Sequence, residues 1–179
     1  MYSVLMTISP KEKPHNLNAS LESIVNQSLV SNDIVIVKDG PFTHELNEVL
    51  DKFCIIYSDI VTVASLSSAT GVANASNIGL ERCKNNLVAR MDSDAISLPD
   101  RFKVQYNYMK SHKEIDLVGG FINEFSNEND PSYLLRKVPL DFESIRKQLI
   151  KRNAVNHVTV MFRKDSIISV GGYIQIDNH

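Results

Sequence analysis

The run Ile34-Val35-Ile36-Val37 constrains the fold more than any other part of the sequence. Four consecutive β-branched residues without polar alternation indicate a strand that is covered on both faces, as in parallel sheets with helices on either side. Apolar residues follow it at helical spacing from 42 to 53, and another strand-then-helix pair precedes it. This alternation predicts an α/β fold whose strands pair in parallel through right-handed crossovers.

The same patterns predict the other elements. We expect strands at 3–8, 60–63, 87–91 and 157–162, and helices at 16–27 with Asn16 as N-cap, at 71–83, from 99 to 109, and at 142–149 after an Asp141 cap. A polar stretch at 126–131 predicts a surface loop, and residues 171–173 predict a turn.

Two of the predicted helices carry specific packing expectations. In the helix predicted at 71–83, one face is made of Val72, Ala75, Gly79 and Cys83, and their small size would let the helix lie close against the sheet. In the helix predicted at 142–149, we expect an inward face made of the apolar residues Phe142, Ile145 and Leu149.

Composition limits the classes of protein that this chain can represent. The 179 residues suit one domain, 1–179, and 43% hydrophobic residues suffice for a core. With 19 Lys and Arg against 21 Asp and Glu, the chain lacks the basic excess of a nucleic-acid binder, so we expect no nucleic-acid partner. Cys54 and Cys83 form no CxxC pair, which favours a reducing compartment.

No window of the sequence is long and apolar enough for a transmembrane segment, and no secretory signal is apparent at the N-terminus. We therefore expect a cytoplasmic protein, with peripheral attachment to the inner face of the membrane left open.

Polar residues follow three of the predicted strands. Thr7 and Ser9 come after the first, Asp39 after the second, and Asp92 and Asp94 after the fourth. Ligands of open parallel sheets bind at the carboxyl ends of the strands. Two carboxylates so close together repel each other unless a cation intervenes, and Mn²⁺ or Mg²⁺ binds one or two carboxylates together with substrate phosphates. The pattern therefore predicts a phosphate-bearing ligand and a divalent metal.

Seven features in order along the chain resemble the GT-A glycosyltransferases of family 2. They are Ser3–Thr7 as the first strand, Leu21–Ser28 as the S-(I/V)-x-x-Q helix, Ile34–Gly40 as the D-D-G segment, Ala75–Gly79 as A-R-N-x-G, Ala89–Asp94 as D-x-D, Leu98–Arg101 as P-x-R, and His157–Arg163 with Gly171–Tyr173 as later landmarks. The resemblance implies a GT-A, Rossmann-like sandwich with a mixed, mainly parallel sheet.

The resemblance also implies roles for individual residues. It assigns donor binding to Thr7, Ser9, Asp39, Asn77, Asp92 and Ser93, and metal binding to Asp94 with Asp92. Thr7 and Asp39 would contact the nucleoside, with the Asp39 carboxylate accepting a base N–H, as in uracil-bearing donors. Asp92 would lie near the ribose, and Asp94 would bind the metal that holds the diphosphate.

The implied activity is that of an inverting, metal-dependent, hexosyltransferase-type enzyme of polysaccharide biosynthesis. Its donor would be a nucleoside-diphosphate sugar, with a UDP-sugar favoured, and its acceptor a saccharide or a lipid-linked saccharide. The sequence departs from the family pattern at Lys38, which replaces an aspartate, at Ser76, which replaces an arginine, and near Ser9, where no aromatic residue is present.

The catalytic base of inverting members usually lies well past the Gly-Gly-aromatic turn. Asp177 is the only carboxylate between that turn and His179, so either Asp177 is the base or the base lies beyond residue 179. The second case would make the chain the donor-binding core of a longer, C-terminally truncated protein.

Other interpretations remain at this stage. Asp39, Asp92 and Asp94 could be ordinary turn residues, His157 could be a structural histidine, and Asn77 could cap local backbone. A non-catalytic nucleotide-sugar-binding module is the main alternative function. A D-x-D phosphatase fits less well because its motif follows the first strand, and the glycine-rich motifs of dinucleotide dehydrogenases and P-loop NTPases are absent from the sequence.

Overall fold

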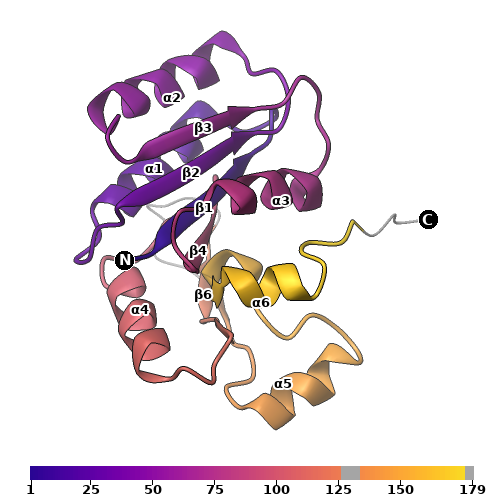
Figure 1. The fold of residues 1–179 in the computed structure, drawn as a ribbon. Coiled ribbons are helices and arrows are strands. Elements are labelled where there is room, and N and C mark those ends of the chain that lie inside the picture. The colour runs from indigo at the N-terminus through magenta and orange to yellow at the C-terminus, as the bar shows by residue number, and fades with distance from the viewer. Residues whose placement is uncertain (126–133, 176–179) are drawn as a thin grey trace.

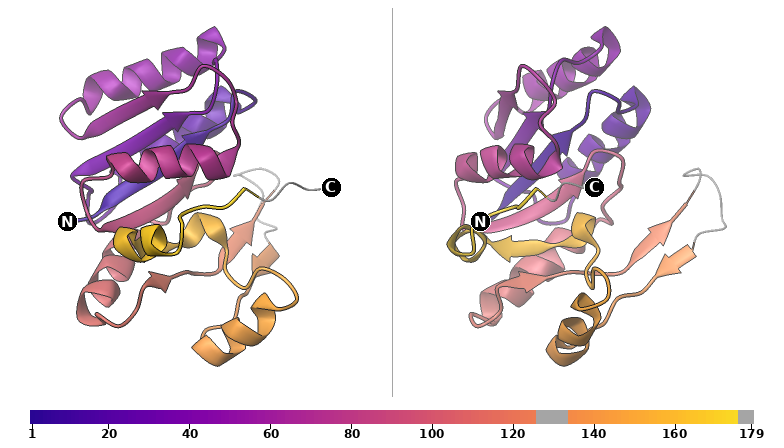
Figure 2. Two further views of the ribbon diagram at one scale, coloured as in Figure 1. Left: turned by 45° about the vertical axis from the view of Figure 1, so that its right-hand side comes forward. Right: turned by 90° about the vertical axis from the view of Figure 1, so that its right-hand side faces the viewer.

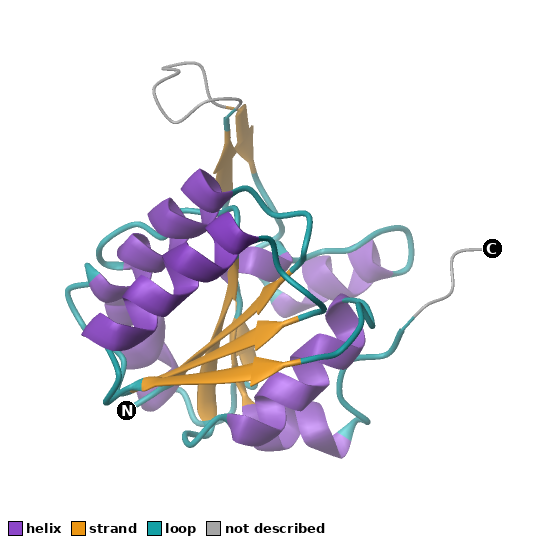
Figure 3. Cartoon of the chain, turned by 90° about the horizontal axis from the view of Figure 1, so that it is seen from above, coloured by secondary structure: helices purple, strands orange, loops and turns teal. Residues whose placement is uncertain are grey.

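In the computed structural model, which describes residues 1–125 and 134–175, a six-stranded sheet lies between two layers of helices (Figures 1 and 3). The strand order is β3-β2-β1-β4-β8-β5. The strands are β1 (Ser3–Ile8), β2 (Asp33–Lys38), β3 (Val61–Ser65), β4 (Leu87–Asp92), β5 (Leu117–Val118) and β8 (Met161–Arg163). The first four pair in parallel and β8 runs antiparallel to β4 and β5, which confirms the predicted mixed, mainly parallel sheet.

The two faces of the sheet are covered by different helices because strand side chains alternate between them. On one face, Val4, Met6 and Ile36 pack with helices α1 (Pro14–Val25), α2 (His44–Ile56) and α4 (Arg101–Ser111). On the other, Leu5 and Val35 pack with α3 (Val72–Arg82) and α6 (Lys164–Ser169). The strands of the centre are therefore buried on both sides, as the apolar run in β2 predicts.

The close packing of α3 depends on Gly79. A Cβ atom added there would collide with Leu5 Cδ1 and lie 2.8 Å from Val37 Cγ2. Ala75 is also fully buried, which confirms the predicted small-residue face at these two positions, whereas Val72 is 56% exposed at the start of the helix.

The start of α1 differs from the prediction. The helix begins at Pro14, with Lys13 in the N-cap position, and not after an Asn16 cap. Proline suits the first helical turn because its fixed backbone angle is helical and its missing N–H would have no partner there. The Asn16 side chain instead donates to Glu12 Oε1.

The last third of the described chain forms smaller elements. Strands β6 (Ile122–Glu124) and β7 (Leu134–Arg136) pair antiparallel, and helix α5 (Phe142–Leu149) stands away from the main sheet (Figure 2). The Asp141 carboxylate accepts from Ser144 N, which confirms the predicted cap. The predicted inward face of α5 is wrong for Phe142 and Leu149, which are 73% and 56% exposed. A hollow, in place of packed side chains, lies between α5 and the neighbouring α4 and β5.

The strand predicted at 157–162 is also shorter than expected. Residues His157–Thr159 form a 3₁₀ helix, η1, and only Met161–Arg163 extend as β8. The backbone N–H and the hydroxyl of Thr159 both donate to the Asn156 carbonyl, and these two bonds hold the chain in a turn. The predicted loop at 126–131 lies outside the described residues. Within the described part of the chain, no helix combines the length and the hydropathy that a membrane crossing requires.

Candidate functional site

The strand register brings residues that are far apart in sequence to one edge of the sheet. Thr7 at the end of β1 is paired with Asp92 at the end of β4, and the backbone N–H of Asp39, just past β2, donates to the Ile8 carbonyl. Leu5 packs on the α3 side, and because side chains alternate, Thr7 projects to that side as well. The predicted convergence of strand-end residues is therefore present for Thr7, Asp39 and Asp92.

Arg90 connects two of these residues from within the core. Its Nη2 donates to Thr7 Oγ1 at 2.7 Å and lies 3.0 Å from Asp92 Oδ1, while Nη1 lies 3.5 Å from the Leu5 carbonyl. The Arg90 side chain is 1% exposed, whereas that of Asp92 is 35% exposed. The family resemblance implies no role for Arg90, although an arginine inside an otherwise apolar strand is a sign of a buried ion pair.

Asp94 lies in a group of negative charges. Burial raises the pKa of its carboxyl, and the negative charges of Glu12 and Asp92 raise that pKa further. Ser93, between the two aspartates, donates to Glu12 Oε2 at 2.6 Å. Glu12 comes from the loop after β1 and was missed in the sequence, where it lies between two lysines and looks like an ordinary surface residue. The three carboxylates create a negative potential that a cation would relieve.

The donor set determines which metal chemistry fits this edge. Among residues 1–125 and 134–175, no three His, Cys, Asp or Glu side chains are close enough together to hold a metal ion on their own. Asp92 and Asp94 supply two carboxylates, which is the number that Mg²⁺ and Mn²⁺ use when substrate phosphates and water complete the coordination. The residues therefore fit a metal that binds together with a phosphate-bearing ligand.

Asp39 organises a loop that is distant in sequence. Its Oδ1 accepts from the backbone N–H of Thr70 at 2.7 Å and from the Thr70 hydroxyl at 2.9 Å, and its Oδ2 accepts from Gly71 N at 3.0 Å. The residue is 7% exposed. Asp39 is thus more than a local turn residue, because it fixes the entrance to α3 beside the end of β2. Thr70 was missed in the sequence.

Asn77 is bound to the glycine-rich turn near the end of the described chain. Its Nδ2 donates to the Tyr173 carbonyl and its Oδ1 accepts from Tyr173 N, both at 2.8 Å. Gly172 has a φ of +75°, and a Cβ there would lie 2.5 Å from Asn77 Oδ1. The Asn77 amide therefore binds backbone that is 96 residues away, and not the local backbone that its sequence context suggested as one alternative.

His157 and Tyr173 lie close to the Arg90–Asp92 pair. Their rings meet edge to face with centroids 5.6 Å apart. Burial and the positive charge of Arg90 lower the pKa of His157, and Asp92 partly opposes this effect. Burial raises the pKa of Tyr173. Both side chains are therefore uncharged at neutral pH.

Polar side chains of α1, and Gln27 just after it, hold the loop that carries the D-x-D motif. Ser20 Oγ donates to the Asp92 carbonyl at 2.9 Å, and Ser23 Oγ accepts from Ser97 N at 3.0 Å. Gln27 Nε2 donates to the Leu98 carbonyl at 2.9 Å. The glutamine of the S-(I/V)-x-x-Q motif therefore stabilises the loop after the D-x-D motif by binding its backbone.

The remaining positions singled out in the sequence are Ser9, Lys38 and Asp177. Ser9 is exposed, and its Oγ accepts from Lys11 N at 3.2 Å. Lys38 extends toward α2, where its Nζ lies 2.6 Å from Asn47 Oδ1 and above the Phe42 ring. Asp177, the candidate base, lies outside the described residues.

Comparison with known proteins identifies relatives along nearly the whole chain. The model of the family described as Glycosyl transferase family 2 matches residues 3–171. The chain is 40% identical over 173 residues to the amylovoran biosynthesis glycosyltransferase AmsE of Erwinia amylovora, covering 97% of this chain and 64% of that protein. It is 33% identical over 172 residues to an Escherichia coli UDP-Gal:alpha-D-GlcNAc-diphosphoundecaprenol beta-1,3-galactosyltransferase, covering 96% of this chain and 62% of that protein.

Two solved structures share the fold. Staphylococcus aureus TarS 1–349 in complex with UDP-GlcNAc superimposes with a TM-score of 0.73 at 15% identity, over 97% of this chain and 48% of that one. The mannosyltransferase PcManGT of Pyrobaculum calidifontis, in complex with GDP-Man and Mn²⁺, gives 0.69 at 14% identity, over 97% and 47%. The chain therefore spans about half to two thirds of the length of these proteins, and its architecture is that of GT-A glycosyltransferases.

Proposed function

The chain belongs to glycosyltransferase family 2, and we propose that it binds a nucleoside-diphosphate sugar at the carboxyl edge of β1, β2 and β4 for transfer of the sugar to an acceptor hydroxyl. The observation that carries this proposal is that Asp92 ends β4 in register with Thr7, with Asp94 two residues further along the chain and Asp39 just past the end of β2. In an α/β sheet this edge is where nucleotide ligands bind.

The nucleoside would lie beside Thr7 and Asp39. Arg90 donates to Thr7 Oγ1, so the Thr7 hydroxyl proton is free to be donated to a ligand. Asp39 Oδ2 accepts one hydrogen bond within the protein, and a carboxylate oxygen has room for a second. Uracil presents an N–H donor to such an acceptor, so we favour a UDP-sugar. The relative that is named for its use of UDP-Gal supports this choice.

Asp94, together with Asp92, would hold Mn²⁺ or Mg²⁺ against the diphosphate. When bound, the metal would act as a Lewis acid that stabilises the negative charge on the departing nucleoside diphosphate. Arg90 fixes the orientation of the Asp92 carboxylate through the 3.0 Å contact. The neighbour with the same fold that was solved in complex with GDP-Man and Mn²⁺ supports the choice of a metal-assisted donor site.

The reaction would be a direct displacement at the anomeric carbon with inversion, by a hydroxyl of a saccharide or of a lipid-linked saccharide. A base must remove the hydroxyl proton, and Asp177 or another residue of the whole protein would supply it. The names of the two curated relatives support a hexosyl transfer in polysaccharide biosynthesis. The activity is proposed for the whole protein, since the chain spans 64% and 62% of these relatives.

A thermal-shift experiment tests the proposal. UDP, GDP, dTDP and CDP are added with and without Mn²⁺, and we expect UDP with Mn²⁺ to raise the melting temperature most, because a ligand that binds the folded state stabilises it. Asp94→Ala should abolish the Mn²⁺-dependent part of this increase. Asp51→Ala, an exposed position on α2, is the matched control and should retain it. An unchanged increase in Asp94→Ala would refute the role of the D-x-D motif.

A second measurement separates an enzyme from a non-catalytic binding module. Release of UDP from UDP-sugars by the whole protein, with a saccharide acceptor present, is expected for an enzyme. Binding without any release would leave the binding module as the correct function.

A further inference from the structure

Helix α5 and the residues on either side of it expose an unusual number of large apolar side chains. Leu140 is 82% exposed, Phe142 73%, Leu149 56% and Ile150 83%. We call these four residues, with Lys147 and Lys151, the α5 patch. Exposed apolar side chains that gather on one short segment beside basic residues indicate contact with another molecule or with a membrane.

Apolar surface continues from the patch onto α4. A hollow of about 380 Å³ separates the two helices, and Leu140 and Phe142 line it together with Val104 and Tyr108. Val104 and Tyr108 are themselves 63% and 46% exposed. The apolar area is therefore open to an external partner and is broader than one helix.

The charge around the patch is strongly positive. Residues 137–152 contain five Lys or Arg and two Asp or Glu, a net charge of +3, although the whole chain has a net charge of −2. One of the two acids, Asp141, is bound to the backbone at the helix N-terminus through Ser144 N. The basic side chains are thus available to a partner that carries negative charge.

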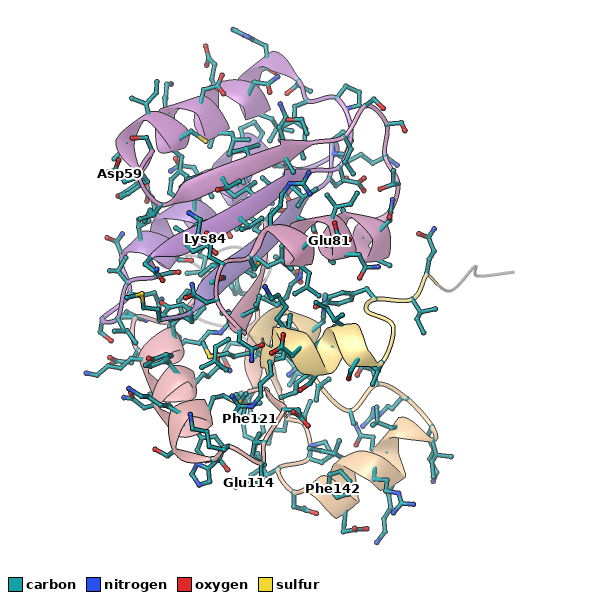
Figure 4. The ribbon with its side chains drawn as sticks, viewed as in Figure 1. Asp59, Glu81, Lys84, Glu114, Phe121 and Phe142 are labelled. Carbon is teal, nitrogen blue, oxygen red and sulfur yellow. The ribbon has the colours of Figure 1, made fainter. Side chains whose placement is uncertain are left out.

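The opposite end of the molecule provides an internal contrast. Ile55 and Ile56 of α2 are also exposed, by 77% and 70%. There, however, residues 44–59 contain one Lys and four Asp or Glu, a net charge of −3. In Figure 4, Phe142 lies at the lower end of the molecule and Asp59, just after α2, near the upper end. Exposed apolar residues therefore occur at both ends, but only the α5 end combines them with positive charge.

We propose that the α5 patch is a docking surface for an anionic lipid bilayer. Leu140, Phe142, Leu149 and Ile150 would enter the boundary between headgroups and acyl chains, while Lys147 and Lys151 would lie at the headgroups. Apolar side chains beside basic ones are the combination by which amphipathic segments bind anionic membranes. The inference rests on the patch alone and does not depend on the proposed transferase activity.

Vesicle sedimentation with the full chain tests this proposal. We expect the protein to sediment with vesicles of phosphatidylglycerol and phosphatidylethanolamine at low salt, and to stay in solution with vesicles of phosphatidylcholine alone. Lys147→Gln with Lys151→Gln should weaken binding at least about tenfold, since a basic residue near an anionic surface contributes roughly a factor of five. Ile150→Asp should weaken it as well.

The α2 end supplies matched controls. Lys52→Gln and Ile56→Asp change the same residue types at exposed positions and should leave vesicle binding unchanged. If these controls lose as much binding as the patch variants, or if the unaltered chain does not bind the anionic vesicles, the proposal is wrong.

Two further measurements keep the result interpretable. Circular dichroism melting checks that each variant is folded, and if Ile150→Asp does not fold, the double lysine variant decides. Sedimentation equilibrium tests a second copy of the chain as the occupant. A dimer that Ile150→Asp dissociates, without vesicle binding by the unaltered chain, would assign the patch to self-association and overturn the proposal.

Discussion

Arg90 lies 3.0 Å from Asp92, two residues further along β4, and its guanidinium also donates to Thr7 on the neighbouring strand. The arginine is buried whereas the aspartate is partly exposed, so the ion pair connects the core to the solvent-accessible edge of the sheet. Such a pair holds the acidic side chain in one orientation before any ligand arrives. The orientation of Asp92 in the candidate donor site therefore depends on a buried residue of the core, Arg90.

Arg90→Met should lower the free energy of unfolding by about 1–3 kcal/mol, because Thr7 and Asp92 would lose a buried hydrogen-bonding partner. Urea denaturation measures this loss. Arg82→Met, at an exposed position of α3, should change stability by no more than about 0.5 kcal/mol. An Arg90→Met protein as stable as the unaltered chain would show that the ion pair makes no net contribution.

Gln27→Leu should also destabilise the protein, by about 1–3 kcal/mol. The amide donates to the Leu98 carbonyl and accepts from Phe102 N, so leucine would leave both backbone groups without these partners. Because these bonds fix the loop after Asp94, we also expect weaker nucleotide binding in the thermal-shift assay. Asn26→Ala, at the exposed neighbouring position, is the control, and equal effects at the two positions would contradict the argument.

Gly79→Ala should lower stability by about 1–3 kcal/mol, since the added methyl group would overlap Leu5 and approach Val37 in the core. The better helix propensity of alanine offsets at most about 1 kcal/mol of this cost. Asn74→Ala, on the exposed side of the same helix, adds propensity without overlap and should not be destabilising. Chemical denaturation of both variants distinguishes overlap from propensity.

The two cysteines should differ in reactivity. Burial raises the pKa of the Cys83 thiol to about 12, whereas Cys54 is only partly buried. Since only the thiolate reacts, iodoacetamide at pH 8 should modify Cys54 much faster than Cys83, which single Cys→Ser variants can measure by mass spectrometry. Comparable rates for the two thiols would indicate that Cys83 is accessible through local opening.

The raised pKa of Cys83 also has a consequence for stability. The thiol has an ordinary pKa of 9.0, so above pH 9 the unfolded chain releases a proton that the folded chain retains. The contribution of the Cys83 thiol to the free energy of unfolding is fully present below pH 9 and decreases as the pH rises toward 12. Cys83→Ala should therefore lose less stability between pH 8 and pH 10 than the unaltered chain.

The residues that contact the strand-end residues of the site were harder to predict from sequence than the strand-end residues themselves. Thr7, Asp39 and Asp92 follow recognisable strands, and the register of a parallel sheet brings such positions together. Glu12 and Thr70 lie in loops, where local sequence does not indicate a partner. The bond between Asp39 and Thr70 spans 31 residues, and only the packing of the loop against the strand end creates it.

The apolar run of β2, the strand and helix periodicities and the order of the motifs by themselves determined the α/β class and the edge of the sheet where ligands would bind. Periodicity reports local burial, because a strand or a helix repeats its faces at a constant interval. The tertiary structure decided which elements contact one another, which periodicity does not predict. It directed the buried charge of Arg90 toward Asp92, and it left apolar side chains of α5 exposed because a hollow separates that helix from α4 and β5. Both outcomes depend on which elements meet in space, and pairwise contacts between distant residues have no period along the chain.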